Sequence, residues 1–372
     1  MRLSQPQSRL RSLDVFRGVT IASMILVNTP GSHEDAYAPL LHADWTGWTF
    51  ADTIFPSFLW IVGVSLTLSS AARLERGQTR GALFKHAVQR SALLFVIGVA
   101  LSAFVFPVRA FPLFRFEHYL QFTGALEKIA LCYLVATAVF LWTSWRGVVV
   151  WIVGLNLVYL GLMYLYPVPA CDDGPWTVRC NFAGYIDRVL LDGYLWGNLE
   201  AQDPDGLGSV LPAITSVLFG VLAGYLLRLE PRAIHRARWM LASGCVLALT
   251  GLALSNWVPI SKPLWTTSFA VLMAGLSSTS MAFWIWICDV RDWSRWLKPF
   301  EIFGTNAIAA YVISVAGMNV AKVHVFGKTL YDDLCLAIAS PPNASLIYAV
   351  LHVLGVFVVV WWMYRRRWFL RI

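Results

Sequence analysis

The segment LLHADWTGWTFADTIFPSF, residues 40–58, places His42, Trp45 and Asp52 directly in front of a long apolar run. A neutral imidazole is a good proton acceptor near neutral pH, since its unperturbed pKa is about 6.5. Asp52 follows His42 by ten residues, where its carboxylate either caps the helix that the apolar run forms or holds one tautomer of the imidazole. The pattern indicates a general base with a carboxylate partner.

A second polar side chain lies at the same kind of boundary. Asn28 ends the preceding apolar run, MILVNTPG, fourteen residues before His42. Its amide either caps a helix that Pro30 and Gly31 terminate, or donates to an oxyanion during acyl transfer. Because acyl transfer to an amine needs both a base and such a donor, the candidate catalytic residues are His42, Asn28 and Asp52.

Other polar and aromatic side chains lie inside later apolar runs or next to their ends. Polar groups within a bilayer are costly and usually line a cavity, whereas interfacial tryptophans also belong to the aromatic belt of membrane proteins. The candidate substrate-binding residues are Trp45, Asn198, Asp203, Asp205, Lys262, Trp265 and Asn306.

The elements that must position these residues are membrane helices. The chain is 58% hydrophobic and 13% charged, and its mean hydropathy is +0.62. Apolar runs of the length that spans a bilayer occur ten times. We therefore expect an all-α, polytopic membrane protein with about ten transmembrane helices, at about 13–30, 50–72, 88–107, 123–143, 147–166, 208–228, 239–257, 264–288, 299–320 and 344–363.

The distribution of charge predicts the orientation of the chain. The net charge is +8, but with ten spans 21 of the 29 Lys and Arg fall on one side, which the positive-inside rule assigns to the cytoplasm together with both termini. This placement argues against a nucleic-acid partner and for a lipid bilayer. Most Asp and Glu fall on the outer side, which suits a cationic or polyhydroxyl partner or only reflects solvated loops.

The remaining features fit one domain, residues 1–372, with its longest outer loop at about 167–207. Cys171 and Cys180 bracket part of that loop and are expected to form a disulfide in an oxidising compartment. No cluster of His and Cys has the spacing of a zinc site, so no metal is expected. The two halves of the chain do not match in loop pattern, which disfavours a transporter built from inverted repeats.

Six segments together resemble one known family. RLRSLDVFRGVTIASMILVNTPG, LLHADWTGWTFADTIFPSFLWIVGVSLTLS, GALEKIALCYL, DPDGLGSVLPAITSVLFGVLAG, ISKPLWTTSFAVLMAG and FGTNAIAAYV occur in the order seen in the heparan-alpha-glucosaminide N-acetyltransferase family. The resemblance implies an enzyme that uses acetyl-CoA from the cytosolic side to acetylate a glucosamine amine across the membrane. By motif, the family's histidine falls on His42 and its asparagine on Asn28.

The chain departs from the lysosomal members of that family in two respects. Those members continue the tryptophan with Asn-Gly, whereas this chain reads Trp45, Thr46 and Gly47, so the acceptor contacts are expected to differ. It also has no counterpart of the luminal N-terminal domain of the animal enzymes. It therefore looks like a bacterial inner-membrane relative whose active site opens to the periplasm and whose acceptor is an amino sugar or glycan.

With acetyl-CoA as the co-substrate, the basic residues at the inner ends of the first three runs have a second interpretation. They either bind the phosphates of CoA or only orient the chain in the membrane. The candidate phosphate-binding residues are Arg11, Arg17, Arg73, Arg76 and Arg90. The alternative function is a membrane transporter of a sugar or amino sugar. A homodimer is compatible with the sequence, which does not fix the oligomeric state.

Overall fold

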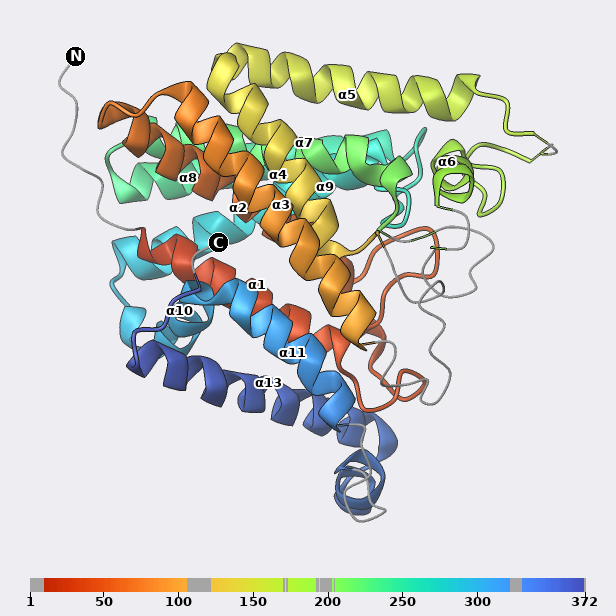
Figure 1. The fold of residues 1–372 in the computed structure, drawn as a ribbon, viewed down its shortest axis with the longest axis vertical. Helices are drawn as coiled ribbons and strands as arrows, with labels where there is room; N and C mark the ends of the chain where they lie inside the picture. Colours follow the sequence, from red (N-terminus) through yellow and green to blue (C-terminus); the bar gives the residue numbers. More distant parts are fainter. Residues whose placement is uncertain are drawn as a thin grey trace.

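The computed structural model describes residues 10–105, 122–169, 173–191, 205–321 and 330–370, together with Cys171, Tyr194 and Asp203. The regular structure of these residues is entirely helical (Figure 1). In chain order the helices are α1 (Arg11–Asn28), α2 (Phe50–Glu75), α3 (Arg80–Val105), α4 (Ala125–Trp142), α5 (Trp145–Leu165), α6 (Phe182–Leu190), α7 (Val210–Leu229), α8 (Ala233–Leu254), α9 (Thr267–Ile285), α10 (Lys298–Thr305), α11 (Ala307–Ala321), α12 (Leu336–Ile338) and α13 (Pro341–Arg365).

Eight of the described helices are long and apolar enough to cross a membrane, namely α2, α3, α4, α5, α7, α8, α9 and α13. The pair α10 and α11 adds a ninth crossing if the two helices, bent by 76° at Asn306, form one span. The tenth predicted span corresponds to α1, which contains Arg11, Asp14 and Arg17 in its first two turns and does not meet the same criterion. The prediction of an all-α polytopic membrane protein is confirmed, with eight or nine such spans instead of ten.

Glycines allow the central helices to approach at backbone distance. A Cβ atom placed on Gly63 of α2 would lie 2.0 Å from the carbonyl oxygen of Val217 in α7, and one on Gly220 of α7 would lie 2.0 Å from that of Trp60. Lipid tails are as apolar as the helix side chains, so the hydrophobic effect does not drive helices together in a membrane. Helices in lipid therefore associate by close packing, which small residues allow. The close contact fixes α2, whose first turn carries Asp52, against α7.

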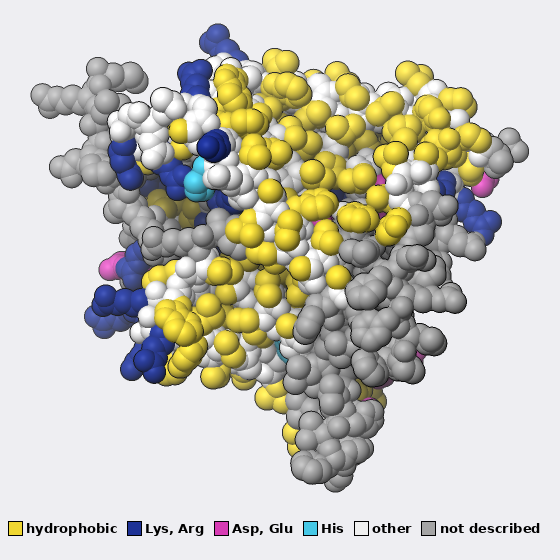
Figure 2. Space-filling view, viewed as in Figure 1, with side chains coloured by type: hydrophobic (Ala, Val, Ile, Leu, Met, Phe, Trp, Pro, Cys, Tyr) yellow, Lys and Arg dark blue, Asp and Glu magenta, His cyan; other side chains and the backbone are white. Residues whose placement is uncertain are grey.

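The α5 helix runs along the upper edge of the bundle in Figure 1. Its outward side chains are apolar and exposed, including Val150 at 70%, Leu157 at 63% and Leu165 at 82%. Figure 2 shows hydrophobic side chains across this face. Exposed apolar side chains over the whole length of a helix are typical of a surface that faces lipid.

The two ends of the bundle differ in charge. Figure 2 shows that Lys and Arg gather mainly at the left edge, where Figure 1 places the start of α1, the connection from α2 to α3 and the start of α10. We call this the basic end. The opposite end, where α2 begins and α6 lies, is called the site end.

Candidate active site

Asp52 is held rigidly in the first turn of α2. Its Oδ2 atom accepts hydrogen bonds from the backbone N–H groups of Thr49 and Ala43, each at 3.0 Å, and its side chain is fully buried. Asp52 N–H in turn donates to Thr49 O at 3.2 Å, and the two residues form a capping box. The carboxylate therefore starts the helix and leaves its second oxygen, Oδ1, for other partners.

His42 is one of those partners. Its Nδ1 atom lies 2.8 Å from Asp52 Oδ1, which is the contact expected from the sequence. Because a carboxylate only accepts hydrogen bonds, Nδ1 carries the proton and the lone pair of the neutral ring lies on Nε2. The His42 side chain is 47% exposed. A base with this tautomer and exposure can take a proton from a group that arrives from the site end.

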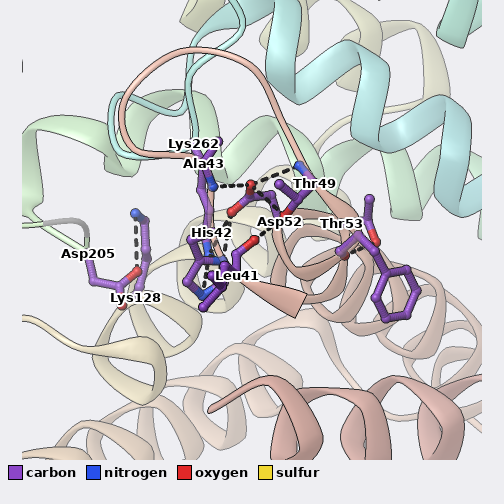
Figure 3. A network of polar contacts seen from close by, with 10 residues as sticks. Leu41, His42, Ala43, Thr49, Asp52, Thr53, Lys128, Asp205 and Lys262 are labelled. Carbon is purple, nitrogen blue, oxygen red and sulfur yellow. Dashed lines mark hydrogen bonds and ion pairs between the residues drawn. The ribbon is translucent and has the colours of Figure 1, made fainter. Parts of the chain in front are cut away.

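Lys262 completes the cluster from the connection between α8 and α9. Its Nζ atom lies 3.1 Å from His42 Nδ1, 3.2 Å from His42 Nε2 and 3.4 Å from Asp52 Oδ1 (Figure 3). Burial lowers the pKa of the Lys262 ammonium below its ordinary value. The negative charges of Asp52 and Asp205 act in the opposite direction and offset only part of this shift. The sequence pointed to Lys262 as a substrate contact and did not predict that it touches His42.

A backbone contact between two loops explains this meeting. Gly47 N–H donates to Ile260 O at 2.8 Å and ties the loop that carries His42 to the loop that carries Lys262. Gly47 has a φ of 93°, a conformation that other residues adopt only with strain. Lys262 O also accepts from Trp265 N–H at 2.9 Å, which closes a turn before α9 begins.

Trp45, a predicted substrate contact, has a hydrogen-bond partner and packing partners within the protein. Its Nε1–H donates to Trp176 O at 2.7 Å, and its indole packs with Tyr159, Ala183 and Leu264. It anchors the His42 loop on the segment around Trp176. That segment is braced by a disulfide between Cys171 and Cys180, whose Cα atoms are 5.4 Å apart.

A second polar network lies beside the first (Figure 3). The fully buried Lys128 donates from Nζ to Ser209 Oγ at 2.9 Å, lies 3.6 Å from Asp205 Oδ1 and stands 4.6 Å from the centre of the Trp265 ring. Trp265 is also fully buried and donates to Ser216 Oγ at 3.0 Å. Asp205 and Trp265 are therefore joined through Lys128, which the sequence did not single out.

Two buried aspartates support this network. Asp203 accepts from Thr123 Oγ1 and, at 2.9 Å, from Asp205 N–H, so that it fixes the turn that presents Asp205. Asp187 of α6 accepts from Gly208 N–H at 2.9 Å, and burial raises the pKa of its carboxyl to about 6. These contacts make Asp203 a positioning residue for the loop, and its role in substrate binding stays a prediction.

The three predicted asparagines do not join the His42 cluster in the described residues. Asn28 is exposed at the end of α1, and no hydrogen bond connects it with His42. Asn306 lies at the bend between α10 and α11, where Nδ2 donates to Trp368 O and Oδ1 accepts from Leu370 N–H, both at 3.1 Å. Its amide holds the C-terminal segment, and its role as a substrate contact stays a prediction. Asn198 lies outside the described residues.

The predicted phosphate-binding arginines belong to helices that begin or end at the basic end. Arg17 donates to Ser65 Oγ at 2.6 Å and lies 3.4 Å from Asp14 Oδ1, while Arg11 lies 3.3 Å from Glu301 Oε1. Arg76 is exposed at the end of α2, and Arg73 is half-buried one turn earlier. None of these contacts involves the His42 cluster.

Arg90 lies deeper, in the wall of an apolar cavity between α1, α2, α3, α4 and α11. The cavity is also lined by Phe55, Val62, Ala125 and Tyr133. The Arg90 guanidinium stands 4.8 Å from the centre of the Tyr133 ring. Phe55 is one helical turn from Asp52, so the cavity reaches from Arg90 toward the His42 cluster. Along α2 it extends from Phe55 to Val62, which is about 10 Å at about 1.5 Å for each residue.

The described part of the chain contains no group of three or more His, Cys, Asp and Glu side chains that could hold a metal ion.

Comparison with known proteins shows which proteins the chain is similar to. Residues 9–177 match the family model described as heparan-alpha-glucosaminide N-acetyltransferase, catalytic. The chain is 29% identical over 370 residues to the human protein of that name, with 84% of this chain and 53% of the relative covered. The mouse protein is 29% identical over 363 residues, with 82% and 53% covered. The chain thus spans about half the length of the curated relatives that it matches, and the resemblance expected from the six motifs is confirmed.

Proposed function

Because this multi-pass membrane protein is related to the heparan-alpha-glucosaminide N-acetyltransferases, we propose that it is a transmembrane N-acetyltransferase. The donor is acetyl-CoA, which approaches from the basic end. The acceptor is the amine of a glucosamine-type sugar or glycan at the site end. By the positive-inside rule, the basic end faces the cytoplasm and the site end faces the periplasm of a bacterial inner membrane.

The observation that carries this proposal is the His42–Asp52 pair, with its 2.8 Å contact, at the end of the bundle opposite to most of the basic side chains. In the proposed reaction, His42 Nε2 removes a proton from the acceptor amine as its nitrogen attacks the thioester carbonyl carbon. The Asn28 amide donates to the resulting oxyanion. The C–S bond then breaks, and the CoA thiolate receives the proton from His42.

A base and an oxyanion donor together would supply the magnitude that such an enzyme needs, and the 2.8 Å contact between His42 and Asp52 supports the first of them. A well-placed general base contributes about a hundredfold to ten-thousandfold in rate, and one oxyanion donor about a hundredfold to a thousandfold. Asp52 supplies the fixed orientation, since its other oxygen is held by two backbone N–H groups. A relay through acetylated His42 uses the same contacts and transfers the same acetyl group in two steps.

The cavity beside Arg90 supports the route of the donor. Its walls are apolar along α1, α2, α4 and α11, which suits the uncharged pantetheine arm of CoA, while its one cation lies on the basic side of Phe55. The phosphates of CoA would stay with the arginines of the basic end, where Arg11, Arg17, Arg73 and Arg76 lie.

The test uses sealed proteoliposomes that contain labelled acetyl-CoA, with glucosamine outside. We expect labelled N-acetylglucosamine outside with the natural protein, and a loss of about a hundredfold or more with His42→Gln. The matched control, His235→Gln, changes a histidine at the start of α8 that has no contact with the cluster. Full activity of His42→Gln, or sugar counterflow without acetyl-CoA and without any acetylated product, would contradict the proposal.

A further inference from the structure

Lys262 occupies the place where an acceptor amine must bind. Its Nζ atom lies 3.1 and 3.2 Å from the two ring nitrogens of His42, the proposed base, and 3.4 Å from Asp52 Oδ1. An acceptor amine needs the same two neighbours, a base to take its proton and a carboxylate to hold its charge. We infer that Lys262 is a site of self-acetylation, which receives the acetyl group from acetyl-CoA when no acceptor sugar is bound.

This inference rests on the proposed function, because acetyl-CoA must reach His42. Reacting groups that are held about 3–3.5 Å apart gain most of the rate advantage of an intramolecular reaction. Lys262 Nζ meets that distance to the base without any ligand present. The Lys262 side chain is only 16% exposed, so it stays against the His42 ring and does not move freely in solvent.

The proton balance of the cluster makes the amine available. Asp52 is the carboxylate of the cluster, and the Lys262 ammonium can pass one proton to His42, whose ring nitrogens both lie within 3.2 Å of Nζ. When the proton moves to His42, the imidazolium forms an ion pair with Asp52 Oδ1 at 2.8 Å, and Nζ becomes a neutral amine with a free electron pair. Burial of Lys262 favours the same direction of transfer, because it lowers the pKa of the ammonium.

The covalent step then needs no reactant besides acetyl-CoA. Nζ forms a bond to the thioester carbonyl carbon, and the C–S bond breaks with its electron pair on sulfur. The CoA thiolate takes the proton held by His42. The neutral His42 then takes one of the two protons of the attacking nitrogen and releases it to solvent, and the other proton remains on the amide. The products are N-acetylated Lys262 and CoA with a free thiol. The product amide lies against His42, so self-acetylation blocks the base and stops further transfer.

Lys128 is the matched control within the same chain. Its side chain is fully buried, yet Nζ is held by Ser209 Oγ at 2.9 Å and lies near Asp205, with no contact to His42. Lys298, at the exposed start of α10, reports acetylation that acetyl-CoA causes without catalysis. Only Lys262 combines an amine with a base at reaction distance among these lysines.

The experiment incubates the purified full-length protein with isotope-labelled acetyl-CoA, with and without glucosamine, and maps acetylated lysines by mass spectrometry. We expect one labelled acetyl group on Lys262, less of it when glucosamine is present, and none on Lys128. His42→Gln should lower the label on Lys262 to the level of Lys298. Pre-incubation with acetyl-CoA alone should inactivate the natural protein and Lys128→Arg, while Lys262→Arg, which keeps the cation, should keep its own starting activity.

The outcomes separate this inference from the proposed function. Acetylated glucosamine together with unmodified Lys262 would overturn the inference and leave the proposed function intact. Equal labelling of Lys262 in the natural protein and in His42→Gln would also overturn it, because the base would then have no part in the step. Absence of acetyl transfer to both glucosamine and Lys262 would contradict the proposed function as well.

Discussion

The most informative single substitution is Asp52→Asn, because it removes one charge and changes almost no volume. An asparagine at this position would keep its carbonyl oxygen toward Ala43 N–H and Thr49 N–H, which now bond to Oδ2. Its NH₂ group would then face His42 Nδ1. Since both groups cannot donate to each other, His42 would turn to the tautomer with its proton on Nε2, and the lone pair would no longer face the acceptor.

The magnitude follows from the contact that is lost. A hydrogen bond to a charged group contributes about 1.5–3 kcal/mol, which corresponds to about a tenfold to 150-fold change in the population of the productive tautomer. The carboxylate also stabilises the imidazolium that forms during the reaction. We therefore expect kcat to fall by about a hundredfold to ten-thousandfold, while KM for glucosamine changes little.

The assay is acetyl transfer in sealed proteoliposomes, with Asp44→Asn as the matched control. Asp44 lies in the same loop, two residues from His42, but its side chain is exposed. It should keep its activity. A kcat for Asp52→Asn within about twofold of that of the natural protein would refute the assignment of Asp52 as the residue that orients the base.

Three further predictions test other parts of the structure. Gly47→Ala, at a φ of 93°, should cost about 1–3 kcal/mol and lower the activity by displacing the loop that carries His42, whereas Gly81→Ala, with open space around its Cβ, should do neither; thermal unfolding and transfer rates check this. Ala125→Phe should fill the cavity and raise KM for acetyl-CoA by about tenfold or more, unlike Val150→Phe on the exposed face of α5, as steady-state kinetics would show. Burial raises the pKa of Asp187 to about 6, so the folded protein favours the protonated carboxyl. The free energy of unfolding should therefore fall by up to about 3 kcal/mol as the pH rises from about 4 through 6. Denaturation curves should show this fall in the natural protein and not in Asp187→Asn.

The sequence predicts the parts of the site that depend on local order. The contact between His42 and Asp52 joins residues ten positions apart, and the capping box at the start of α2 is visible in Thr49 and Asp52. The apolar runs likewise predict the membrane helices, because their length and hydropathy are properties of one segment. The exception is α1, which the apolar run at about 13–30 predicts as a span, although the charged residues in its first turns keep the helix from meeting the same criterion.

The contacts between distant segments could not be predicted in this way. Lys262 meets His42 only because Gly47 N–H bonds to Ile260 O across 213 positions, and one sequence contains no signal for that pairing. The bend of 76° at Asn306 has the same origin, since Trp368 and Leu370 use both ends of its amide. Lys128 is hidden for another reason: a single lysine in an apolar helix does not reveal its partners.

The central claim is that the acetyl group of a donor from the basic end reaches His42 at the site end. The most direct measurement is an experimental structure of the protein with a non-transferable thioether analogue of acetyl-CoA. We expect the pantetheine arm in the cavity beside Arg90 and Phe55, and the phosphates at the arginines of the basic end. The acetyl carbonyl carbon should lie about 3–3.5 Å from the position of an amine that contacts His42 Nε2. An analogue that binds with its acetyl end away from His42, or that enters from the site end, would contradict the account.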